Sequence, residues 1–207
     1  MNKIIMTVVM AVFFLLLNVG TGNTNEIITL EAEQVKCLQM VYDISSGLKI
    51  YGDTWGETIA SIAYQESWCN GSHWRTHGVV VGDINSKGIP RSLGIMQVQV
   101  PTARWVNKKF PDIFRNRYGE RRPSNEEIAI DLLIDNKFNI EIGSHYFITM
   151  LSYREGNWEK AILSYNRGMG SNPTDVNNYV HKVKKWRKLI VIPFLRGEYK
   201  IKERLIE

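Results

Sequence analysis

Apolar residues recur at helical spacing in the first segment that contains both apolar and polar residues. Between residues 29 and 46 they are Leu30, Cys37, Leu38, Val41 and Ile44. This spacing places them on one face of a helix. Gly47 follows at the point where such a helix would end. The pattern predicts an N-terminal helix, within residues 23–49, that packs on the rest of the domain.

The next apolar stripe leads to a carboxylate. Thr54 and Glu57 have the T-x-x-E spacing of a capping box, which predicts the start of a second helix. The stripe that follows contains Ile59, Ile62 and Ala63, and its next step falls on Glu66. A buried ion pair would explain this position. Burial also raises the pKa of a carboxyl group, because a low dielectric disfavours the charged form, and such a group can serve as a general acid.

Residues 78–98 lose the helical period. The β-branched residues Val79, Val80 and Val81 precede several turn formers, which are Gly82, Asp83, Asn85 and Gly88. This pattern predicts a small β-hairpin or an irregular wing.

The rest of the chain returns to helical patterns. Pro101 is expected to open a short helix that runs to about Lys108 and that Pro111 ends. A second capping box, Ser124 and Glu127, predicts the start of another helix. Further helices are expected over residues 136–153, 158–165 and 176–189, with a Gly- and Pro-rich loop over 167–173. The predicted fold class is mostly α (α+β), with one small β-element.

Composition and charge narrow the class of protein. The chain has 207 residues, of which 44% are hydrophobic and 23% charged. This composition is typical of a globular protein and not of a disordered one, so we expect one globular domain. The net charge of +5 favours an anionic partner such as nucleic acid, anionic lipid or a carboxylate-rich wall polymer. Residues 193–207 form a basic C-terminal tail in this interpretation, and the lysines and arginines from Lys182 to Arg204 are either a solvated face or a contact to the wall or membrane.

The N-terminus predicts export. Lys3 precedes an apolar run over residues 4–19, and the small residues Gly20, Thr21 and Gly22 follow. These are the three parts of a secretory signal peptide, here residues 1–22, and a retained membrane anchor is the alternative. An oxidising compartment permits a disulfide between Cys37 and Cys69. Two separate buried cysteines would also fit. We expect the protein in the periplasm or cell envelope.

Five short segments, in this order, resemble the soluble lytic transglycosylase family, whose catalytic domain is similar to goose-type lysozyme. They are Glu66-Ser67; Ser92-Leu93-Gly94-Ile95-Met96-Gln97; Asn139-Ile140 with Gly143 and Tyr146; Tyr165-Asn166 with Gly168; and Tyr179-Val180. The resemblance covers about residues 50–190. It implies a lysozyme-like helical catalytic domain, residues 50–192, with the β-hairpin as a wing.

The resemblance also implies the reaction. Glu66 would be the catalytic acid and base that cleaves the MurNAc–GlcNAc β-1,4 bond of peptidoglycan and leaves 1,6-anhydromuramic ends. The implied substrate-binding residues are Ser92, Gly94, Met96, Gln97, Tyr146, Tyr165, Asn166 and Tyr179. Met96 and Gln97 would contact the sugar, Tyr165 and Asn166 would bond it on the cleft floor, and Tyr179 would place its hydroxyl near Glu66. Gly143 would permit close helix packing.

The sequence departs from the family pattern at three places. Ile95 replaces the commoner Leu, Ser164 replaces a typical Ala, and the stretch between Glu66 and Ser92 is longer than usual. If Asp83 in that stretch reached the cleft, the protein could activate water and act as a muramidase (a lysozyme-type hydrolase). A non-catalytic peptidoglycan-binding protein is the other alternative.

The expected partners follow from the same reasoning. They are peptidoglycan glycan strands and, if the protein serves secretion or conjugation, a multiprotein assembly of the cell envelope. No nucleic-acid-binding motif is recognised, so nucleic acid is not expected. Contact with a membrane is expected only through the signal peptide or the basic tail, and the protein is expected to be a monomer. The spacing of Cys and His residues predicts neither a metal site nor a cofactor.

Overall fold

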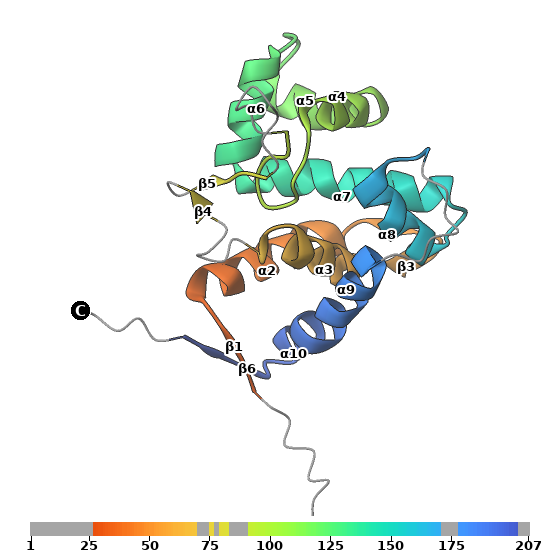
Figure 1. Ribbon diagram of the computed structural model, residues 1–207. Helices are drawn as coiled ribbons and strands as arrows, with labels where there is room; N and C mark the ends of the chain where they lie inside the picture. Colours follow the sequence, from red (N-terminus) through yellow and green to blue (C-terminus); the bar gives the residue numbers. More distant parts are fainter. Residues whose placement is uncertain (1–26, 70–74, 77–78, 83–90, 171–177, 203–207) are drawn as a thin grey trace, which may run out of the picture.

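Helices account for most of the computed structural model, which describes residues 27–69, 75–76, 79–82, 91–170 and 178–202 (Figure 1). The helices are α2 (Ala32–Ser46), α3 (Gly56–Ser67), α4 (Val100–Lys109), α5 (Pro111–Tyr118), α6 (Asn125–Ile134), α7 (Asn136–Tyr153), α8 (Trp158–Arg167), α9 (Asn178–Trp186) and α10 (Ile192–Leu195), with a π-helical turn, η2 (Arg187–Val191), between the last two. The mostly α prediction is confirmed.

Strands are short and form three separate pairs within the described residues. β2 (Lys49–Ile50) pairs antiparallel with β3 (Asp53–Thr54), and β4 (Arg75–Thr76) pairs antiparallel with β5 (Val79–Val80). The β4–β5 hairpin is the predicted wing, and it begins three residues before the region where the sequence placed it. β1 (Ile28–Leu30) pairs in parallel with β6 (Tyr199–Ile201).

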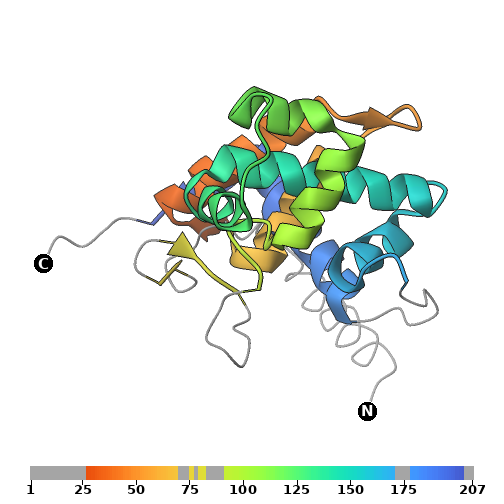
Figure 2. The same ribbon diagram turned by 90° about the horizontal axis from the view of Figure 1, so that it is seen from above.

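Helix α7 is the central element of the core. It crosses the middle of the domain, with α4, α5 and α6 on one side and α2 and α3 on the other (Figures 1 and 2). Its fully buried apolar side chains include Ile140, Ile142, Phe147, Met150 and Leu151. A helix that is apolar on several faces suits burial on several sides. The position of each element that carries the site is therefore set relative to one buried helix.

The two ends of the described chain lie together. The parallel β1–β6 pair sets Ile28 opposite Tyr199, and the amide of Lys202 donates to the carbonyl of Leu30 at 2.7 Å. Residues 193–202 were expected to form a tail, and the structure corrects this. Pro193 lies in α10, where it follows the first helical residue and needs no amide partner.

The two predicted capping boxes have different outcomes. Ser124 is confirmed, because its Oγ accepts from the amide of Glu127 at 3.1 Å and the Glu127 side chain accepts from the amide of Ser124 at 2.7 Å. The box at Thr54 is wrong. Thr54 pairs with Lys49 in the β2–β3 hairpin, α3 begins two residues later at Gly56, and Glu57 instead binds Arg187 at 2.5 Å.

Pro111 also has a role other than the predicted one. Pro111 starts α5 rather than only ending α4, because the fixed φ of proline suits the first turn of a helix. The helix predicted over residues 136–153 is confirmed at both ends. No described helix is both long and apolar enough to span a bilayer. The predicted signal peptide lies outside the described residues.

A disulfide joins the N-terminal helix to the end of α3. Cys37 on α2 is bonded to Cys69, with 5.5 Å between their Cα atoms, and both residues are buried. Beside it, the side-chain amide of Gln34 donates to the carbonyl of Trp68 at 3.0 Å. The helix within residues 23–49 thus packs on the domain through a covalent link as well as through apolar contacts.

Removing this link should destabilise the fold. The bond closes a loop of 32 residues, so the Cys37→Ala, Cys69→Ala double variant should lose about 3–4 kcal/mol in free energy of unfolding. Urea unfolding of both proteins measures the loss. Wild-type protein in reductant should unfold like the double variant, and an unchanged midpoint in both would contradict the prediction.

Candidate active site

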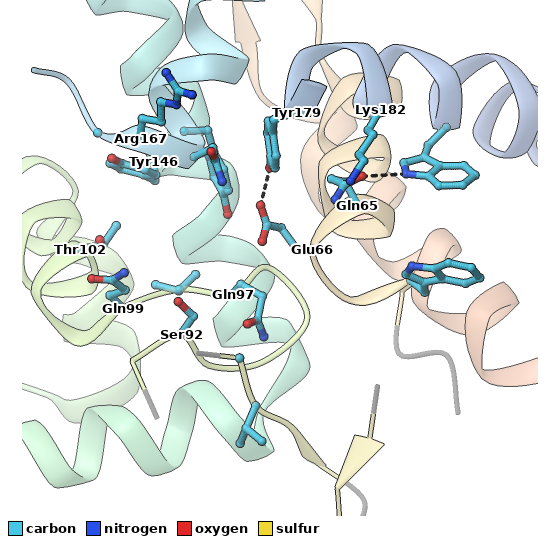
Figure 3. Close-up of a pocket in the computed structure, with 18 residues that line it drawn as sticks. Gln65, Glu66, Ser92, Gln97, Gln99, Thr102, Tyr146, Arg167, Tyr179 and Lys182 are labelled. Carbon is cyan, nitrogen blue, oxygen red and sulfur yellow. Dashed lines mark hydrogen bonds between the residues drawn. The ribbon is translucent and has the colours of Figure 1, made fainter. Parts of the chain in front are cut away.

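Glu66 lies in the last turn of α3, next to a buried apolar stripe. Ile59, Ile62 and Ala63 have no exposed surface, as their spacing predicted. Glu66 is half-buried and its carboxylate points into a cleft (Figure 3). Directly after it, Trp68 and Cys69 both have φ of 51°, a left-handed conformation that stops the helix. The helix thus ends just beyond the carboxylate.

The cleft has a volume of about 870 Å³ and is bordered by α3, α4, α7, α8, α9, residues 81–82 and residues 92–99. This volume is large enough for a sugar-sized ligand. Seven of the residues singled out from the sequence line it, namely Glu66, Ser92, Gln97, Tyr146, Tyr165, Asn166 and Tyr179. The five motif segments, far apart in the sequence, therefore meet in one cleft around a single carboxylate.

Tyr179 is a hydrogen-bond partner of Glu66. Its hydroxyl donates a hydrogen bond to Glu66 Oε1. Burial of the hydroxyl raises the pKa of Tyr179 well above its ordinary value, and the charge of Glu66 raises it further. The phenol therefore keeps its proton at neutral pH and remains a donor to the carboxylate.

Tyr165 supports the loop opposite Glu66. Its hydroxyl donates to the carbonyl of Met96 at 2.8 Å, and its ring lies 5.3 Å from that of Tyr146. Burial raises the pKa of Tyr165, with a further contribution from the Glu66 charge. The Tyr165 hydroxyl thus donates within the protein and has only acceptor positions left for a ligand, so its expected bond to the sugar stays a prediction.

Asn139 connects that loop to the core. Its Oδ1 accepts from the amide of Met96 at 2.7 Å, and its Nδ2 donates to the carbonyls of Leu93 and Leu132 at 2.8 and 3.1 Å. The side chain is fully buried, so each of these bonds replaces a bond to water that burial has removed. Asn139 thus joins two of the five motif segments by hydrogen bonds, its own segment and the one that contains Leu93 and Met96.

Two glycines let this loop approach its neighbours. Gly94 has φ of +70°, and a Cβ there would lie 2.3 Å from the Leu132 carbonyl. A Cβ on Gly82 would lie 1.8 Å from Gln97 Oε1. Gly94 accordingly supports the loop from behind and does not line the cleft, whereas Gln97 lines it and donates through Nε2 to the Gly94 carbonyl at 2.8 Å.

The expected contact between Met96 and the sugar is wrong. Met96 has no exposed surface, because its side chain faces α7 and not the cleft. A Cβ on Gly143 would lie 2.6 Å from the Met96 Cβ. Gly143 therefore admits a loop residue, and not a second helix as expected from the sequence.

Several cleft residues were missed in the sequence. They are Gln65, Trp68, Val81, Gly82, Val98, Gln99, Thr102, Arg167, Lys182 and Trp186, whereas Gly168, which also lines the cleft, was part of a motif segment. One signal was available for two of them. Lys182 and Trp186 follow Tyr179 by three and seven positions on α9, so they share its helix face.

Glu66 is the single carboxylate among the described residues that line the cleft. Asp53 is exposed in β3, and Glu57 pairs with Arg187. Asp83, the other acid considered from the sequence, lies outside the described residues. A lone carboxylate held by a phenol, among amide, hydroxyl and aromatic side chains, is suited to proton transfer on a polyhydroxylated ligand.

Comparison with protein families assigns the chain to one of them. A family model described as "Transglycosylase SLT domain" matches residues 50–188. This range covers well over half of the chain and contains every cleft residue. A search of curated proteins found no match.

The Asn139 clamp can be tested by substitution. Asn139→Ala leaves one buried amide and two buried carbonyls without their partner, so we expect a loss of about 3 kcal/mol or more in free energy of unfolding. Chemical unfolding measures it. Asn139→Asp keeps the acceptor for Met96 but sets a carboxylate oxygen against two buried carbonyls, so it should lose at least as much, and an unchanged stability in either variant would contradict the assignment of the bonds.

The Tyr179 bond can be tested by removing one oxygen. Tyr179→Phe keeps the ring but removes the donor to Glu66. A hydrogen bond to a charged group contributes about 1.5–3 kcal/mol, so kcat on purified peptidoglycan should fall roughly 10- to 100-fold. Circular dichroism should confirm an unchanged fold. A variant with full activity would show that the bond plays no part in turnover.

Proposed function

Because the chain belongs to the transglycosylase SLT domain family, which acts on peptidoglycan, we propose that it is a lytic transglycosylase that uses Glu66. It cleaves the MurNAc–GlcNAc β-1,4 bond and leaves 1,6-anhydromuramic ends. We further propose that residues 1–22 direct export and that the enzyme works in the periplasm or cell envelope. The substrate is the glycan strand of the wall.

The observation that carries this proposal is the single carboxylate in the described cleft. Glycosidases that transfer the sugar to water ordinarily use two carboxylates, one as acid and one as base or nucleophile. Glu66 is accompanied instead by the phenol of Tyr179. A reaction in which the substrate supplies its own nucleophile needs only one protein acid.

The proposed reaction balances with that one group. Protonated Glu66 gives its proton to the glycosidic oxygen, the C1–O bond breaks, and positive charge develops on the muramyl ring. The 2-acetamido group of the substrate stabilises this charge. Glu66, now ionised, takes the proton of the muramyl C6 hydroxyl, and the C6 oxygen attacks C1 to close the anhydro ring. No water is consumed, and Glu66 ends protonated as it began.

Tyr179 supports both halves of the cycle. When Glu66 is ionised, the Tyr179 hydroxyl donates to it and stabilises the charge. Because burial raises the pKa of Tyr179, this proton stays on the phenol and does not compete with the proton that Glu66 transfers. Gln97, Asn166 and Ser92, which line the cleft, offer hydrogen-bonding groups to the sugar hydroxyl and acetamido groups.

The product and the acid can be tested together. Purified sacculi are incubated with residues 23–207 and with the same protein carrying Glu66→Gln, and the released muropeptides are analysed by mass spectrometry. The wild type should release fragments with 1,6-anhydromuramic ends. The variant, which has no proton to give, should release at least 1,000-fold less while keeping the same unfolding midpoint.

Other products would point to other functions. Fragments that are one water heavier, with reducing ends, would identify a muramidase, and Asp83→Asn would be the next variant. Full activity of Glu66→Gln would overturn the role of Glu66. Binding of sacculi without any release of product would indicate a binding protein or the need for an activating partner.

A further inference from the structure

The cleft continues past Glu66 into an aromatic arm that none of the five motif segments forms. In Figure 3, Tyr146, Thr102 and Arg167 lie on one side of Glu66, and Gln65 and Lys182 lie on the other. The second side is completed by two tryptophans, Trp68 and Trp186. We call Trp68, Lys182 and Trp186 the aromatic arm.

The tryptophans of the arm form one cluster with Tyr64. The ring centroids of Trp68 and Trp186 are 5.9 Å apart, and Tyr64 lies 5.9 Å from the first and 5.3 Å from the second. Tyr64 is buried, whereas Trp68 keeps 36% of its surface exposed and lines the cleft. Large aromatic surface at the wall of a polar cleft is a typical contact for the apolar face of a sugar ring.

The arm is held in place from behind. The indole Nε1 of Trp186 donates to Gln65 Oε1 at 2.9 Å, which joins α9 to the residue next to Glu66. Trp68 is fixed by the Gln34 bond to its carbonyl and by the disulfide at Cys69. Its left-handed φ of 51° is unusual for a bulky residue. A surface anchored in this way can bind a ligand with little loss of side-chain entropy.

Lys182 gives the arm its charge. Its side chain is exposed and lines the cleft, and among the described residues no carboxylate lies within ion-pairing distance of it. The next cations of the same segment differ. Lys184 pairs with Glu159 at 2.9 Å, and Arg187 pairs with Glu57 at 2.5 Å. Lys185 lies over the Trp186 ring, with 5.1 Å between its Nζ and the centroid, and is also exposed.

We propose that the aromatic arm selects a muramyl unit that still carries its stem peptide. Trp68 and Trp186 contact the sugar, displacing the exposed Lys185 side chain where necessary, and Lys182 pairs with a carboxylate of the peptide. This inference rests on the proposed function, because it takes the glycan strand as the ligand. It goes further, since it makes the enzyme discriminate between strands with peptides and strands from which they have been removed.

The charge of the cleft agrees with this ligand. In a strand that carries its peptides, the lactyl group of each muramyl unit is bound as an amide and the sugar rings are neutral, so the carboxylates available to a cation beside the aromatic surface belong to the peptide. Stem peptides carry free carboxylates, and a lysine ammonium is a point charge that can pair with one in a flexible chain. The pairing is exposed to solvent, so a selectivity of a few-fold and a strong dependence on salt are expected.

The test measures binding without turnover. Glycan strands of one length are prepared with stem peptides and, after amidase treatment followed by methylamidation of the freed lactyl carboxylates, as uncharged strands without them. The dissociation constant of each is measured for the Glu66→Gln protein. We expect the peptide-bearing strand to bind about 5-fold more tightly. Adding Lys182→Gln should weaken the peptide-bearing strand about 5-fold and leave the bare strand unchanged, so that the preference disappears.

Matched controls separate the two parts of the arm. Lys184→Gln removes a cation of the same helix that is paired with Glu159 and should change neither affinity. Trp186→Ala should weaken both strands roughly 10-fold, and Trp186→Phe should recover most of this loss. Trp158→Ala removes a tryptophan that also lies under a lysine, Lys184, but does not line the cleft. It should leave both affinities unchanged.

Two results would overturn the proposal. One is a Lys182→Gln protein that keeps the preference or that loses affinity for both strands equally. The other is a Trp186→Ala protein that binds like Trp158→Ala. Failure of the proposed function is visible separately, because a wild-type enzyme that releases no product from sacculi can still discriminate between the strands, and an active enzyme can fail to do so.

Discussion

The buried amide of Asn139 is the interaction on which the rest of the site depends. It binds three backbone groups of two segments at 2.7 to 3.1 Å, and all of them are out of reach of water. The loop that it fixes to α7 receives the Tyr165 hydroxyl at the Met96 carbonyl and presents Gln97 to the cleft. Because unmet hydrogen bonds in a core are unfavourable, this one side chain gives the loop a single conformation relative to Glu66.

Predictions from the sequence succeeded where the cause is local. The capping box at Ser124 closes within four residues. Helix α7 has the bounds expected for it because the Asp135 side chain caps its start and the left-handed residues Glu155 and Gly156 follow its end. The box at Thr54 has the same letters but failed. There the backbone of Thr54 pairs with Lys49 in a hairpin and the Glu57 side chain binds the distant Arg187, and neither partner can be recognised from a four-residue motif.

The candidate site was predictable to the extent that it lies on helices. An apolar stripe on α3 led to Glu66, and the same rule applied to α9 would have led from Tyr179 to Trp186. Met96 could not be assigned in this way, since it lies in a loop without a period. Its orientation follows from Gly143, whose missing side chain leaves the space that Met96 fills. A contact between a loop residue and a distant helix, such as this one, can be recognised only from the three-dimensional structure.

Under the proposed function, catalysis and selectivity both depend on the turn at the end of α3. Glu66 belongs to the last helical turn, and two left-handed residues then reverse the chain so that Trp68 faces the same cleft. Such a conformation is unfavourable for residues with a side chain, and it persists here because the disulfide at Cys69 and the Gln34 bond hold it from α2. The N-terminal helix precedes the family-matched region, yet it fixes the surface beside the acid. In this way a segment outside the catalytic domain can tune which strands the acid meets.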